Sequence, residues 1–97
     1  MNRSTLENIL DRASGVTRGA KNGSVFEVEE GHRVTFYLGR PGQAMEISDL
    51  QRCTLHDDYV ELASGESETI TFVEYEAIHA LAAKPPKGDA KRRAGFA

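Results

Sequence analysis

Residues 24–38 read SVFEVEEGHRVTFYL, and their alternation of apolar and polar side chains sets the class of the fold. A period of two is typical of a half-buried strand, because successive side chains point to opposite faces of a sheet. Residues 30–32 interrupt the alternation with a glycine-containing turn. We therefore predict a hairpin in which Phe26 lies opposite Phe36 and both face the core.

A second hairpin is predicted around the loop at residues 57–58, where two aspartates separate two alternating runs. Residues opposite each other in an antiparallel pair point to the same face of a sheet. This loop pairs Cys53 with Leu62 and Leu55 with Val60, so that all four apolar side chains fall on one face. The register of this hairpin follows from the sequence.

A third hairpin is predicted through the loop at residues 64–67, whose sequence is Ser-Gly-Glu-Ser. We expect Ile70 and Phe72 to share the buried face with Leu62, which requires an odd number of loop residues. An even number would turn the strand over, because a slip of one residue moves every side chain to the other face.

Helices are predicted at both ends of the ordered region. Ser4 and Glu7 fit a capping box, and the apolar stripe that follows indicates a helix over residues 5–14, ended by Gly15. A second apolar stripe indicates a helix over residues 74–83, which the prolines after it would terminate.

The predicted fold class is α+β: an N-terminal helix, about six mostly antiparallel strands and a C-terminal helix. Residues 44–47 supply one short strand. Such strands form a bent sheet or a small, partly open barrel, which over residues 24–83 is similar in outline to SH3-like or pleckstrin-homology-like (PH-like) barrels. We expect a single domain over residues 1–83 and a flexible tail over residues 84–97.

Composition supports one small globular domain without a cofactor. The chain has 97 residues, of which 39% are hydrophobic and 28% charged. It holds neither an apolar run of the roughly 18 residues that a membrane helix needs nor the apolar core of a secretory signal. We therefore expect a cytoplasmic protein that is not inserted in a membrane. The single cysteine, Cys53, excludes an internal disulfide and a multi-thiolate zinc site.

The net charge of −3 is unevenly distributed along the chain. Residues 46–83 are strongly acidic and contain Arg52 as their single Lys or Arg, whereas residues 84–97 are basic. The candidate anion contacts of this tail are Lys87, Lys91, Arg92 and Arg93. The tail can act as a solubilising extension, bind an anionic partner such as nucleic acid or a lipid surface, or fold back on the acidic body.

Catalytic and metal-binding patterns are weak. Cys53 and His56 have a Cys-x-x-His spacing next to two aspartates, but strand alternation points Cys53 to the core and His56 to solvent. We therefore predict a buried structural cysteine and no metal site. The histidines lie in no recognisable nucleophile motif, and the glycines match neither phosphate-binding spacing. The sequence predicts neither an enzyme nor a cofactor.

The remaining hypothesis is a non-catalytic protein-interaction or regulatory module that binds another protein, or a second copy of itself, through a sheet edge or an acidic sheet face. The residues expected to be exposed on that face are Tyr37, Arg52, Tyr59 and Glu61. The alternative is a nucleic-acid-associated protein that uses the basic tail, whose affinity for nucleic acid would fall steeply with salt.

Overall fold

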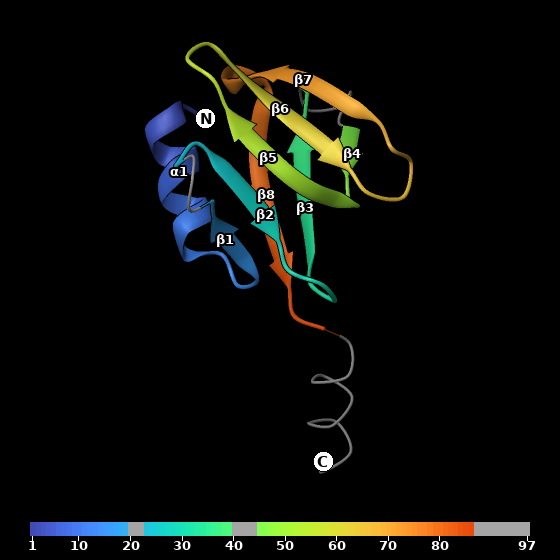
Figure 1. Ribbon diagram of the computed structural model, residues 1–97. Helices are drawn as coiled ribbons and strands as arrows, with labels where there is room; N and C mark the ends of the chain where they lie inside the picture. Colours follow the sequence, from blue (N-terminus) through green and yellow to red (C-terminus); the bar gives the residue numbers. More distant parts are fainter. Residues whose placement is uncertain (20–22, 40–44, 87–97) are drawn as a thin grey trace.

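The computed structural model describes residues 1–19, 23–39 and 45–86 (Figure 1). These residues form one α-helix followed by eight antiparallel strands in two open sheets. The elements in chain order are α1 (Arg3–Arg12), β1 (Val16–Arg18), β2 (Val25–Val28), β3 (Arg33–Leu38), β4 (Met45–Ile47), β5 (Leu50–Leu55), β6 (Tyr59–Ser64), β7 (Ile70–Glu74), the 3₁₀-helix η1 (Tyr75–Ala77) and β8 (Ile78–Lys84).

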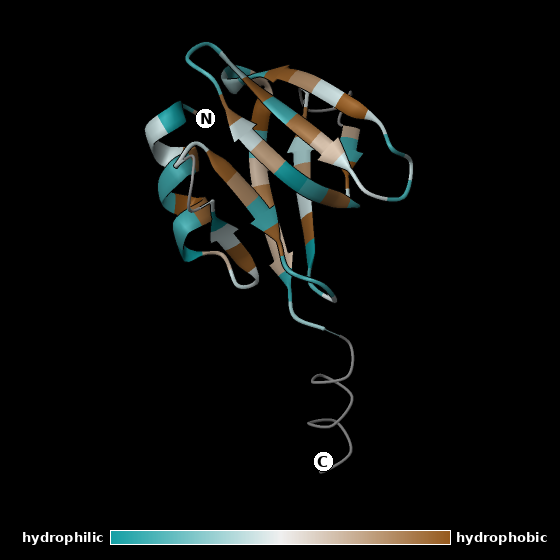
Figure 2. Ribbon diagram, viewed as in Figure 1, coloured by the Kyte–Doolittle hydropathy of each residue, from teal (hydrophilic) through white to brown (hydrophobic). Residues whose placement is uncertain are grey.

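The large sheet has the strand order β1-β2-β5-β6-β7, and the small sheet has the order β4-β3-β8. The inner faces of both sheets supply the core, and α1 adds Leu6 and Leu10 at one side of it (Figure 1). Figure 2 shows hydrophobic and hydrophilic residues alternating along β6, as expected of a strand with one buried face. The core is therefore a single layer shared by the two sheets.

The helix α1 begins earlier than predicted. It spans Arg3–Arg12, and its N-cap is Asn2, whose side-chain oxygen accepts a hydrogen bond from the Thr5 N–H at 2.8 Å. The predicted capping box at Ser4 is therefore wrong, because Asn2 already caps the helix. The helix also ends earlier than predicted: its C-cap is Ala13 in an extended conformation, so the predicted helix end at Gly15 is wrong. Gly15 lies two residues beyond that cap and has a left-handed φ of +79°. A Cβ there would lie 2.2 Å from the His32 ring, so glycine also permits this close contact.

The predicted hairpin between β2 and β3 is wrong. β2 pairs with β1 and β5 in the large sheet, whereas β3 pairs with β4 and β8 in the small sheet. The turn at residues 30–32 carries the chain from one sheet to the other. Phe26 and Phe36 are nevertheless both buried, because the inner faces of the two sheets meet in one core. Alternation predicted which side chains are buried but not which strand lies beside which.

The predicted hairpin between β5 and β6 is confirmed. Cys53 pairs with Leu62, and Leu55 pairs with Val60. The His56 N–H donates to the Tyr59 carbonyl oxygen at 2.9 Å and closes the turn at the two aspartates. This short loop fixes the register, which is why the sequence was sufficient here.

The predicted orientation of β7 is wrong. Leu62 pairs with Thr71 and Val60 pairs with Val73, so Val73 faces the core, while Ile70 and Phe72 face solvent. The loop before β7 is closed by a hydrogen bond from the Ser64 N–H to the Thr69 carbonyl oxygen at 2.8 Å. This closure turns the strand over relative to the prediction.

The predicted C-terminal helix is also wrong. The chain forms the short 3₁₀-helix η1 and then β8, which pairs with β3 along its length, with Val34 opposite Ala83 and Phe36 opposite Leu81. β3 is buried and needs hydrogen-bonding partners on both sides, and this requirement outweighs the helical spacing of the apolar residues. Among the described residues the strands form two open sheets and no closed barrel, in place of the predicted single bent sheet or partly open barrel of SH3-like or PH-like outline. The tail residues 87–97 lie outside the described residues.

Candidate interaction surface

The outer face of the large sheet carries a group of exposed apolar side chains at its β7 end. Strand register places Glu61 beside Phe72, and Ala63 beside Ile70. Phe72 is 63% exposed, Ile70 54% and Tyr59 40%, and the ring centroids of Tyr59 and Phe72 are 6.1 Å apart. We call Tyr59, Ile70 and Phe72 the apolar patch.

Polar contacts position the side chains next to the apolar patch. The His56 ring stacks on Tyr59 with a centroid distance of 4.5 Å, and its Nε2 lies 3.2 Å from Glu61 Oε1. The Tyr75 hydroxyl donates to the His56 carbonyl oxygen, and burial raises the pKa of that hydroxyl. Contacts at its carbonyl oxygen and at its ring therefore hold His56 in place. The stacked His56 ring in turn restricts the movement of the Tyr59 ring.

Three of the four predicted surface residues lie on this outer face. Tyr59 and Glu61 are on β6, and Arg52 on β5 is paired through its Nε with Glu27 Oε2 at 3.4 Å. Tyr37 lies elsewhere, on the outer face of the small sheet, where it is paired with Glu46 and Ala80. The structure thus separates Tyr37 from the other three residues.

Ile70 and Phe72, the two most exposed members of the apolar patch, were predicted from the sequence to lie in the core. The only signal that could have identified them is the length of the loop before β7. Thr71 and Val73 alternate with Ile70 and Phe72, so each face of the strand has an apolar residue and the pattern alone does not choose between them.

Cys53 lies on the inner face of the large sheet, between the two strands that flank β5. It is buried, and burial raises the pKa of its thiol to about 12. The thiol is therefore protonated at neutral pH and lacks the thiolate that nucleophiles and metal ligands require. In the part of the chain that the structure describes, no cluster of His, Cys, Asp or Glu side chains is suited to hold a metal ion.

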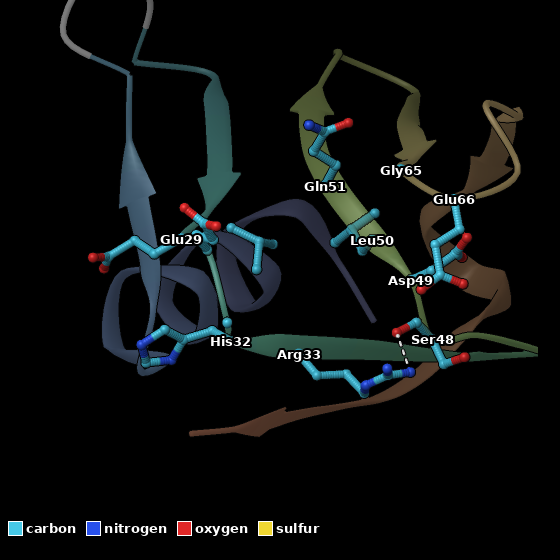
Figure 3. Close-up of a pocket in the computed structure, with 12 residues that line it drawn as sticks. Glu29, His32, Arg33, Ser48, Asp49, Leu50, Gln51, Gly65 and Glu66 are labelled. Carbon is cyan, nitrogen blue, oxygen red and sulfur yellow. Dashed lines mark hydrogen bonds between the residues drawn. The ribbon is translucent and has the colours of Figure 1, made fainter. Parts of the chain in front are cut away.

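Apart from the apolar patch, a cleft lined mainly by polar residues opens at one end of the molecule. The turn after β2, the start of β5 and the loop after β6 meet there (Figure 3). Arg33 Nη1 donates to the Ser48 carbonyl oxygen at 3.4 Å, and the Asp49 carboxylate accepts from the Ser67 N–H at 3.4 Å. Figure 3 shows His32 on one side of the cleft and Asp49 on the other. The hydrogen bonds of Arg33 and Asp49 stabilise the local loops.

A more apolar depression lies beside the outer edge of β7, a strand that pairs with β6 alone among the described residues. It is bounded by β7 on one side and by Leu38, Met45 and Ala77 on the other, and Met45 is 55% exposed. The depression therefore adjoins the apolar patch, and both lie at the same strand. Phe72 belongs to the apolar patch and also lines this depression.

Comparison with protein-family models, with curated proteins and with solved structures found no match to this chain. In the described residues, no helix has the length and apolar character needed to cross a membrane.

Proposed function

We propose that this protein is a non-catalytic protein-interaction module that binds a partner protein through the outer face of β6 and β7. One observation carries the proposal: Tyr59, Ile70 and Phe72 expose large apolar side chains side by side on a single sheet face. A single exposed apolar residue is normal on a protein surface, whereas a contiguous group of them marks an interaction site. Aromatic residues are also enriched at interfaces between proteins.

The charges around the apolar patch favour a protein partner over nucleic acid. Glu61 and Glu74 lie on the same face, and Asp57 and Asp58 form the turn directly before Tyr59. Carboxylates at these positions repel phosphates. A nucleic-acid partner would therefore depend on the basic tail, which lies outside the described residues.

The test compares capture of partners by the wild-type chain and by variants of the apolar patch. We expect Tyr59→Ala and Phe72→Ala to weaken binding of the captured and purified partner by about tenfold or more, because aromatic anchors at interface centres dominate binding energy. Tyr37→Ala is the matched control, because Tyr37 is 38% exposed on the other sheet. We expect this control to bind like the wild type, and all three melting temperatures to stay within a few degrees of it.

Two outcomes would overturn the proposal. Unchanged binding by both patch variants together with lost binding by Tyr37→Ala would move the interface to the small sheet. If nuclease treatment and truncation after residue 86 each abolished binding, that result would support the nucleic-acid alternative. Thermal unfolding of each variant separates lost binding from lost folding.

A further inference from the structure

Within the part of the chain that the structure describes, the main chain of β7 presents unpaired groups at the edge of the large sheet. β7 is the last strand in the sheet order and, in the described residues, pairs with β6 alone. In an antiparallel pair, main-chain groups point alternately toward the partner strand and away from it. The Ser64–Thr69 hydrogen bond sets this alternation, so the groups of Thr71 and Val73 point toward β6. The main-chain N–H and C=O groups of Ile70 and Phe72 point away from β6.

These main-chain groups belong to the same two residues whose side chains form most of the apolar patch. A strand placed beside β7 would bond to the main chain of Ile70 and Phe72, and its outward side chains would contact their side chains. Its inward side chains would enter the depression bounded by Leu38, Met45 and Ala77. Both faces of an added strand would therefore meet apolar surface.

Acidic residues stand at both ends of this edge. Glu66 and Glu68 precede β7, Glu74 ends it and Glu76 follows it, and all four are exposed. A second copy of β7 would bring acids against acids in either strand direction, and like charges placed opposite each other are destabilising. Charged residues at an edge strand also protect it from pairing with identical copies. The charges therefore select against self-association and favour a partner with cations at both ends.

We propose that the free edge of β7 binds an extended segment of another protein, with an apolar centre and Lys or Arg at each end, by adding it to the large sheet as a further strand. This inference rests on the proposed function, because it specifies how the apolar patch and the adjoining edge recognise the partner. Main-chain hydrogen bonds would supply affinity, and the apolar centre and cationic ends would supply specificity.

The test uses the full chain labelled with ¹⁵N and a short synthetic peptide of alternating valine and threonine with lysines at both ends. We expect saturating peptide to slow hydrogen exchange of the Ile70 and Phe72 amides, while the Tyr37 amide on the other sheet is unchanged. A peptide with glutamates at both ends should bind about tenfold more weakly or not at all. Binding of the lysine peptide should weaken as salt is raised.

A peptide with the lysine ends retained and alternate amides N-methylated isolates the role of the main chain. We expect it to bind at least about tenfold more weakly, because methylation removes its donors while its side chains remain. Equal binding would overturn strand addition and leave side-chain binding by the patch in place. Absence of binding by the lysine peptide would also overturn this inference, and the proposed function would still be decided by Phe72→Ala and the captured partner.

Discussion

At the scale of single residues, Cys53 shows how burial controls chemistry. Its ordinary thiol pKa of 9.0 rises to about 12 in the fold. As pH rises past 9, the unfolded chain loses the thiol proton before the folded chain does. The free energy of unfolding contributed by this group is therefore fully present below pH 9 and is lost between pH 9 and 12.

We expect this contribution to fall by up to about 1.4 kcal/mol per pH unit in that window. The measurement is urea unfolding of the wild type and of Cys53→Ala at several alkaline pH values. All groups other than Cys53 are the same in both proteins, so only the difference between the two pH profiles reports on Cys53. Parallel profiles would show that the thiol is not protected, and rapid reaction of the folded chain with iodoacetamide at pH 8 would show the same.

At the scale of secondary-structure elements, two residues near the start of α1, Asn2 and Ser4, are both of a type that caps helices, and only Asn2 does so here. Asn2 accepts the Thr5 N–H, whereas Ser4 lies inside the first turn. We expect Asn2→Ala to lower the free energy of unfolding by about 1 kcal/mol, because an N-cap is lost.

Ser4→Ala is the matched control and should change the stability by less than about 0.5 kcal/mol. Urea unfolding monitored by circular dichroism measures both variants. A larger effect at Ser4 than at Asn2 would restore the capping box as the true start of the helix.

At the scale of the whole molecule, the two sheets share one core and should unfold together. Phe36 is fully buried in the small sheet, and β6 lies in the large sheet. We expect Phe36→Leu to lower the free energy of unfolding by about 1–3 kcal/mol, because it leaves a gap in a close-packed core. Amide protection in β6 should fall by the same free energy as protection in β3.

Hydrogen exchange measured by NMR checks this expectation, with Tyr37→Leu as the exposed neighbouring control. Loss of protection confined to β3 and β8 would mean that the sheets unfold as separate units. Equal loss in both sheets would establish one cooperative core.

The amino-acid sequence was sufficient for the local features of this protein. It predicted a helix at the N-terminus, strands with alternating side chains, the burial of Phe26, Phe36 and Cys53, and the register of β5 and β6 from the Cys53–Leu62 pair to their turn. Each of these depends on neighbouring residues or on a short loop, where side-chain spacing and turn geometry act directly. It also placed Tyr59 and Glu61 on the outer face of β6, where Tyr59 is exposed and Glu61 is half-buried.

Beyond the hairpins with short loops, the neighbours of each strand follow from the tertiary structure and not from local sequence. Main-chain hydrogen-bonding groups are the same in almost every residue, so alternation identifies a buried face without identifying the strand beside it. For that reason β2 and β3 separate into different sheets, and the segment Ile78–Lys84 becomes a strand because β3 needs a partner. The orientation of β7 was settled by its loop, and that orientation brings Phe72 out of the core and onto the candidate interaction surface.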